Sequence, residues 1–287
     1  MHLTYKVCQK LCKIFPRTMC YGVAMFVARI CFYLHAGPRE VLIDNFKVVL
    51  NGKSDKEIIQ TAKRAYLNFA KYIIDFLLQH TFDDDKLKEV MEVENIHFLH
   101  EAVAQGKGVI IASTHMGNWE LGGALIAKNG YKTNAIVLPH ADDAVTEFFN
   151  KQRAHFGINV IFTSSVLRAC INTLKKGEVL GILSDRDVTQ AGEEVQFFGK
   201  TASMPKGSAY FSRKTGSIIL PTIVIRQKND KYKMIFEDYY TCACTKDKKS
   251  DIINCIEKYV KILEKYVRQY PDQWFVFDRI WNTSEDK

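Results

Sequence analysis

The chain has 287 residues, of which 47% are hydrophobic and 25% are charged. This composition is typical of a folded globular protein and excludes an intrinsically disordered chain, which has fewer apolar and aromatic residues. Lysine and arginine exceed aspartate and glutamate by 40 to 32, a formal net charge of +8. The excess favours anionic partners, namely nucleic acid, phosphorylated lipid, an acidic carrier protein or a bilayer surface, without choosing among them.

The eight cysteines indicate neither a zinc site nor a disulfide framework. No two of them form a C-x-x-C pair, which zinc ribbons and redox sites use. A chain of this size does not need disulfides to stabilise its core. We therefore interpret the cysteines as reduced thiols in a reducing compartment.

Residues 1–36 are predicted to associate with a membrane. Four basic residues recur at steps of four, three and four, which gathers them on one face of a helix beside an apolar face. They are Lys6, Lys10, Lys13 and Arg17. The apolar run 19–34 follows directly, but Arg29 interrupts it and it is shorter than the ~20 residues of a comfortable membrane span. It has no signal-peptide cleavage site. The basic amphipathic segment and the apolar run together resemble an interfacial anchor. The alternatives are a true membrane span and an ordinary buried helical hairpin.

Residues 37–287 are expected to form one domain, helical over 37–92 and α/β over 93–287. The range 55–78 is predicted to be an amphipathic helix, because its apolar residues recur every three or four positions. Ser54 and Glu57 form a capping box at its start.

From residue 94 onwards the pattern changes to strands that alternate with helices. Such alternation predicts an α/β fold with a largely parallel central sheet flanked by helices. The predicted strands are 108–113, 133–139, 158–162, 179–184, 217–226 and 232–237, and the predicted helices are 119–129, 142–156, 164–176, 205–215 and 250–269.

The chemistry is expected just after the strands, because parallel sheets bind ligands at the carboxyl ends of their strands. His115 follows the strand 108–113, and Glu120 lies in the first turn of the next helix. Across this bend Glu120 can accept a hydrogen bond from one imidazole nitrogen and leave the other as a base. The alternative is an ordinary loop histidine, because H-x-x-x-x-E by itself is a weak pattern.

A second acidic position follows the strand 179–184. Asp185 and Asp187 could bind a metal-bound sugar nucleotide, orient a hydroxyl or pair with an arginine. No histidine or cysteine accompanies them at metal-ligand spacing. Arg153 and Arg168 lie on the two preceding helices, where each is either a solvated charge or a phosphate-binding guanidinium.

Five stretches together resemble a known family, the late (lauroyl/myristoyl) acyltransferases of lipid A biosynthesis, with their relatives that acylate phosphatidylinositol mannosides, in the lysophospholipid acyltransferase-like superfamily. They keep the family order over about residues 90–281. The stretches are GKGVIIASTHMGNWELGG, FFNKQRAHFG, LKKGEVLGILSDRD, VQFFGKTASMPKGSAYFSRKTGSIILPTIVIR and PDQWFVFDRIW.

The resemblance implies a glycerolipid acyltransferase-like fold and transfer of a fatty acyl chain from acyl carrier protein to a hydroxyl of an anionic membrane glycolipid, most directly a lipid A precursor. It places the enzyme at the cytoplasmic face of the bacterial inner membrane. It implies His115 and Glu120 as the catalytic pair and Arg153, Arg168 and Asp185 as substrate-binding residues. Neither a cofactor nor a metal is expected beyond the acyl carrier protein co-substrate.

The expected mechanism is direct transfer with His115 as general base, because no serine or cysteine stands beside it as a nucleophile. Backbone amides at the helix start after Gly117 are expected to stabilise the oxyanion. The alternatives are an acyltransferase acting on another lysophospholipid or glycolipid such as a phosphatidylinositol mannoside, a metal-dependent glycosyltransferase using Asp185 and Asp187, and a non-catalytic lipid-binding protein. A nucleic-acid binder is disfavoured, since the basic residues are dispersed and no binding motif occurs.

Overall fold

A computed structural model describes residues 2–162 and 166–281 of the chain. The first two residues of the predicted helix 164–176 and the last residues of the predicted domain, 282–287, lie outside the described residues.

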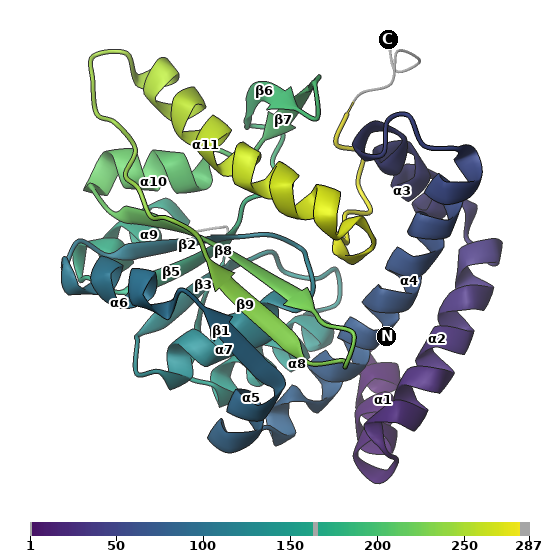
Figure 1. The fold of residues 1–287 in the computed structure, drawn as a ribbon. Coiled ribbons are helices and arrows are strands. Elements are labelled where there is room, and N and C mark those ends of the chain that lie inside the picture. Colours follow the sequence, from purple (N-terminus) through teal and green to yellow (C-terminus); the bar gives the residue numbers. More distant parts are fainter. Residues whose placement is uncertain (1, 163–165, 282–287) are drawn as a thin grey trace.

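In the described part of the chain, one large sheet has seven strands in the order β1-β9-β8-β2-β5-β3-β4 (Figure 1). All neighbouring strands are parallel except β8 and β9. The predicted α/β fold with a largely parallel sheet is therefore confirmed. The strands are β1 (Met91–Glu94), β2 (Val109–Ser113), β3 (Thr133–Val137), β4 (Asn159–Phe162), β5 (Val179–Leu183), β8 (Ile218–Arg226) and β9 (Tyr232–Phe236).

The central strands are apolar on both faces because helices cover both faces of the sheet. In β2, Ile110 and Ala112 belong to one core, with α9, α10 and α11, whereas Val109 and Ile111 belong to the other, with α5, α6, α7 and α8. Figure 1 shows α10 and α11 on one side of the sheet and α5 and α7 on the other. The helices are α5 (Asp84–Val90), α6 (Ile96–Ala104), α7 (Trp119–Lys128), α8 (Asp143–His155), α9 (Val166–Lys175), α10 (Gly207–Thr215) and α11 (Lys248–Gln269).

Two elements differ from the sequence prediction. Strand β1 begins at Met91, inside the range 37–92 that was predicted to be helical, because it pairs with β9 from far along the chain. An antiparallel hairpin of β6 (Glu193–Phe197) and β7 (Lys200–Met204), which was not predicted, lies outside the main sheet against α11 (Figure 1).

Four N-terminal helices stand at one side of the α/β body (Figure 1). Helix α4 confirms the prediction of a helix over 55–78, and both hydrogen bonds of the capping box between Ser54 and Glu57 are present. Helix α2 packs along α4, and it is the one described helix long and apolar enough to cross a membrane. The helices are α1 (His2–Ile14), α2 (Arg17–Leu34), α3 (Ala36–Val49) and α4 (Asp55–Leu78).

Helices α1 and α2 leave large apolar side chains exposed, which an ordinary buried hairpin would not do. We call this surface the N-terminal apolar face. Its members are Leu3, Val7, Leu11, Ile14, Phe15, Met19, Val23, Phe26, Val27, Ile30, Tyr33 and Leu34.

A buried ion cluster holds α2 against the body. Asp75 of α4 accepts hydrogen bonds from Arg17 and Arg226, each at 2.8 Å, and from Tyr21 at 2.6 Å. Burial raises the pKa of Asp75, but the two guanidinium groups and Tyr21 outweigh it, so the pKa is lowered. The cluster joins α2 and α4 to the end of β8, and thus to the sheet edge where the strands end.

Candidate active site

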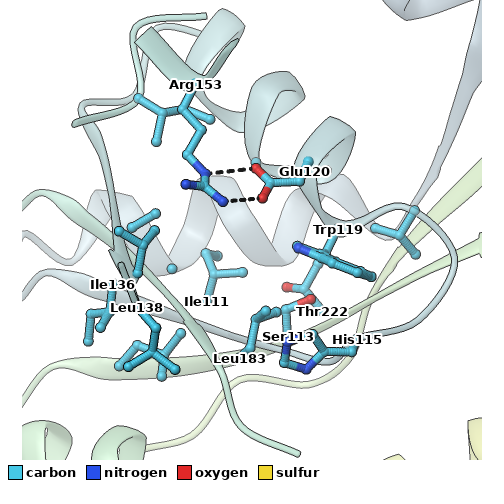
Figure 2. A pocket seen from close by; sticks show the side chains of 18 of the residues that line it. Ile111, Ser113, His115, Trp119, Glu120, Ile136, Leu138, Arg153, Leu183 and Thr222 are labelled. Atoms are coloured by element: carbon cyan, nitrogen blue, oxygen red, sulfur yellow. Dashed lines mark hydrogen bonds and ion pairs between the residues drawn. The ribbon is translucent and has the colours of Figure 1, made fainter. Parts of the chain in front are cut away.

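A cavity of about 410 Å³ opens at the carboxyl ends of β2, β3 and β5. Most of the surface that lines it is apolar, and the aliphatic side chains Ile111, Ile136 and Leu183 contribute to it (Figure 2). His115 lines the same cavity as this apolar surface. The cavity therefore brings a titratable group next to a space suited to a hydrocarbon chain.

A tight turn carries the chain from β2 to α7 and positions His115. Gly117 in this turn has φ +59°, and a Cβ there would lie 2.1 Å from the carbonyl oxygen of Val224, so only glycine fits. Asn118 then caps α7, its side chain accepting from the Leu121 amide at 3.1 Å.

The His115 ring is hydrogen-bonded to Asp185, with 2.9 Å between Nδ1 and Oδ1. The other carboxylate oxygen accepts from Thr114 Oγ1 at 2.7 Å and from the His115 amide at 2.9 Å. Burial raises the pKa of Asp185, but His115 and the hydrogen bonds from Thr114 and the His115 amide outweigh it and hold the pKa at about 2. An ionised carboxylate on Nδ1 leaves Nε2 as the ring nitrogen available for proton transfer.

The prediction that Glu120 orients His115 is wrong, because Asp185 holds that position. Strands β2 and β5 are parallel neighbours with Ser113 opposite Leu183, and the Ser184 amide extends this register by donating to the Ser113 carbonyl at 2.8 Å. His115 and Asp185 therefore leave adjacent strands side by side. The role expected for Asp185, substrate binding, changes accordingly to holding the imidazole.

Glu120 instead forms a buried ion pair with Arg153 of α8 (Figure 2). Arg153 donates from Nη2 to Oε1 at 2.6 Å and from Nε to Oε2 at 3.1 Å. Burial lowers the pKa of Arg153, but the Glu120 charge reverses this, and the pKa is raised. Both residues line the cavity, so the structure brings three predicted residues, His115, Glu120 and Arg153, to one space.

The structure distinguishes between the alternatives left open for Arg168 and Asp187. Arg168 is exposed on α9 and is not among the residues that line the cavity. Asp187 accepts hydrogen bonds from Ser203 at 2.7 Å and the Gly192 amide at 2.8 Å, which hold the loop between β5 and β6. Asp185 and Asp187 are therefore engaged by different partners.

The C-terminal segment contributes a residue that was not predicted. Trp274 is fully buried, and its indole Nε1 donates to Asp185 Oδ2 at 3.0 Å. Next to it, the Phe275 amide donates to the His115 carbonyl at 2.8 Å, and the Gly117 amide donates to the Gln273 carbonyl at 3.2 Å. The stretch PDQWFVFDRIW was part of the family resemblance, but nothing in its spacing indicates that it lies beside His115.

Trp119 holds the other side of the imidazole. Its ring meets the His115 ring edge to face, with 5.1 Å between the centroids, and stacks on Tyr72 at 4.4 Å. The His115 ring is thus positioned by a carboxylate on one edge and an aromatic side chain on its flank.

Comparisons with known proteins show the family of this chain. The sequence profile of the family described as bacterial lipid A biosynthesis acyltransferase matches residues 4–283. The chain is 25% identical to the phosphatidylinositol mannoside acyltransferase of Mycolicibacterium smegmatis over 228 residues, 76% of this chain and 73% of that protein. It is 26% identical to the phosphatidylinositol mannoside acyltransferase of Mycobacterium tuberculosis H37Rv over 161 residues, 54% of this chain and 51% of that protein.

A second kind of relative is named for lipid A biosynthesis. The chain is 24% identical to the lipid A biosynthesis palmitoleoyltransferase of Escherichia coli K12 over 207 residues, 70% of this chain and 64% of that protein. The family profile covers both the N-terminal helices and the α/β body with its His115–Asp185 pair. The chain therefore belongs to the bacterial lipid A biosynthesis acyltransferase family.

Proposed function

We propose that this acyltransferase moves a fatty acyl chain from acyl carrier protein to a hydroxyl of an anionic membrane glycolipid at the cytoplasmic face of the bacterial inner membrane. The observation that carries the proposal is the imidazole of His115, hydrogen-bonded to Asp185, at a largely apolar cavity. Family membership supports the reaction class. The acceptor is either a lipid A precursor or a glycolipid of the phosphatidylinositol mannoside type, because both names occur among the relatives.

In the proposed reaction, His115 Nε2 takes the proton of the acceptor hydroxyl while the hydroxyl oxygen attacks the thioester carbonyl. The tetrahedral intermediate then expels the carrier's thiolate, which receives the proton from the imidazolium, so that an ester and a free thiol are formed. Asp185 keeps Nδ1 protonated and stabilises the imidazolium, as the third member of a catalytic triad does. General-base assistance of this kind contributes roughly 10²–10⁴ in rate.

The oxyanion needs donors near the thioester carbonyl. The Gly117 amide is already occupied by Gln273 and the Leu121 amide by Asn118, so the Trp119 and Glu120 amides at the start of α7 are the remaining candidates among the backbone groups predicted for this role. They have no acceptor within the helix, and the helix dipole adds positive potential there. Loss of one such donor in other enzymes typically costs about 3–4 kcal/mol.

The cavity and the N-terminal helices suit lipid substrates. We infer that the aliphatic lining receives the acyl chain, with the Glu120–Arg153 pair as a polar wall. We also infer that the N-terminal apolar face enters the bilayer interface while Lys6, Lys10 and Lys13 meet anionic headgroups.

The test is an assay of the purified protein in detergent with acyl-carrier-protein thioester and a panel of acceptors, with products identified by mass spectrometry. Acyl-coenzyme A in place of the carrier thioester tests the donor. The His115→Ala variant should lose at least ~100-fold in turnover, whereas His97→Ala, a change at an exposed histidine of α6, should match the wild type. Vesicle binding without turnover on any acyl donor, or near-normal turnover of His115→Ala, contradicts the proposal.

A further inference from the structure

We propose that Arg186 is an anion-recognition residue of the cavity and binds a phosphate group of a substrate. This inference rests on the proposed function and adds a binding residue to it. Two arginines occur among the described residues that line the cavity, Arg153 and Arg186. Their surroundings differ in a way that leaves only one of them able to exchange its partner for a ligand.

Arg153 is committed to the protein. Its Nε and Nη2 both donate to Glu120, and both side chains are almost entirely buried, with 13% and 9% exposed. The two-pronged contact neutralises the guanidinium inside the cavity wall. A ligand anion would have to displace a buried carboxylate to reach it, which leaves that carboxylate without a partner.

Arg186 is held much more loosely. Its Nη1 lies 2.9 Å from Oδ2 of Asp278, whose side chain is 60% exposed. Its Nε is buried and has no hydrogen-bond partner among the described residues. The pair with Asp278 is therefore a solvent-screened contact of the kind that contributes little, and one guanidinium donor is left unsatisfied.

The donors that remain on Arg186 match a bidentate anion. Arg153 shows the geometry in the same cavity, where Nε and Nη2 together grip two oxygens of one carboxylate. The corresponding edge of Arg186 contains the unpartnered Nε. A rotation of the side chain that turns this edge to a substrate phosphate would pair two donors with two oxygens, the arrangement that a planar guanidinium favours.

The backbone at Arg186 is fixed, so only the side chain needs to move. On one side, Asp185 is tied to Thr114, His115 and Trp274. On the other side, Asp187 is tied to the loop before β6. Arg186 thus follows directly after Asp185, whose carboxylate holds the proposed catalytic imidazole. A phosphate bound by the Arg186 guanidinium would therefore have a defined position relative to His115.

Phosphate can reach the cavity from two sources under the proposed function. One is a phosphate on the headgroup of the glycolipid acceptor, and the other is the phosphodiester in the prosthetic arm of the acyl carrier protein. Each of these phosphate groups presents two oxygens to a guanidinium. Measuring the KM of the acceptor and the KM of the donor in turn separates the two sources.

The kinetic test compares Arg186→Gln with Asp278→Asn in the full-length protein. Arg186→Gln should raise the KM of the phosphate-bearing substrate at least tenfold and change kcat less than threefold. Asp278→Asn should lower the same KM, because it removes the internal competitor. Arg268→Gln, which breaks an exposed pair with Glu264 on α11, is the matched control and should change neither constant.

The outcome assigns the source or overturns the inference. A change confined to the acceptor KM, absent with a dephosphorylated acceptor, assigns the headgroup; a change confined to the donor KM assigns the carrier arm. Unchanged KM values for both substrates, or a loss of kcat alone, overturn the inference.

A binding measurement keeps the test independent of turnover. Titration of the protein with decyl phosphate, followed by ³¹P NMR line broadening, should show saturable binding in the wild type and in Arg268→Gln. Arg186→Gln should lose at least tenfold in affinity. Equal affinity of wild type and Arg186→Gln contradicts the inference even if no acceptor is found, whereas phosphate-dependent binding without turnover leaves Arg186 supported and the proposed function refuted.

Discussion

At the scale of single residues, the Asp185 carboxylate is the group on which the base role proposed for His115 depends. Its Oδ2 accepts from three donors, Thr114, the His115 amide and Trp274. Its Oδ1 is then committed to Nδ1 of the imidazole. The carboxylate therefore determines both the orientation of the ring and which nitrogen carries the proton.

Asp185→Asn is expected to abolish most activity while keeping the fold. The three donors select the amide oxygen for the Oδ2 position, so the amide NH₂ faces Nδ1 and donates to it. That bond stabilises the tautomer with its proton on Nε2, which cannot accept the proton of the acceptor. We expect turnover to fall at least ~100-fold, measured with the carrier assay, with native circular dichroism as the control. Activity close to wild type would show that Asp185 does not set the tautomer.

At the scale of elements, α2 carries apolar side chains that no other described element covers. Phe26 and Ile30 lie one helical turn apart and are 62% and 43% exposed. Soluble proteins rarely expose so many large apolar side chains on one helix without a partner. We expect the bilayer interface to be that partner.

The double variant Phe26→Ser with Ile30→Ser should weaken vesicle binding at least ~100-fold, because each large apolar side chain contributes about 1.5–3 kcal/mol when it leaves water. Co-sedimentation with anionic vesicles measures the effect. Ile59→Ser on α4, which is 44% exposed but lies outside the N-terminal apolar face, should bind as the wild type does. Equal binding by all three proteins rules out this face as the membrane contact.

At the scale of the whole molecule, the Asp75 cluster joins the N-terminal helices to the α/β body. The Asp75 side chain is fully buried, and Arg226 beside it is 5% exposed. Tyr232 of β9 also donates to the same carboxylate. Arg17 and Arg226 share this one buried carboxylate, and the partly exposed Asp230 lies 3.5 Å from Arg226 as a second counter-charge.

Asp75→Asn is expected to destabilise the protein by about 3–5 kcal/mol, because it leaves two guanidinium groups with no buried counter-charge. Chemical unfolding at neutral pH measures the loss. The matched change Asp272→Asn, which breaks the exposed pair with Arg64, should cost less than about 1 kcal/mol. Equal stability of the two variants would show that the cluster does not hold the molecule together.

The lowered pKa of Asp75 also gives the sign of a pH effect. Since the folded-state pKa lies below the ordinary value of 3.8, the carboxylate stabilises the fold above that value, and this contribution is lost as the pH falls below it. Asp75→Asn should therefore flatten the loss of stability that occurs as the pH falls below 3.8, as measured by chemical unfolding.

Much of the fold followed from local patterns in the sequence. Apolar runs such as 108–113 and 179–184 predicted buried strands, and the three- and four-residue period over 55–78 predicted α4. Hydrophobic periodicity reports which side of an element is buried, so it identifies elements without tertiary information. It could not find β1, which is short and becomes a strand by pairing with β9.

The candidate site, too, was predicted from the sequence only in part. Placement after a strand was enough to select both His115 and Asp185 as candidate site residues. The residue predicted to hold the His115 imidazole, however, was Glu120, five residues away. Only the parallel register of β2 with β5 decided that Asp185 holds the ring. Trp274 reaches that carboxylate from 89 residues further along the chain, a contact for which no spacing rule exists. Side chains of one strand or helix obey a period, whereas contacts between elements depend on how the sheet and the C-terminal segment pack, which only the tertiary structure determines.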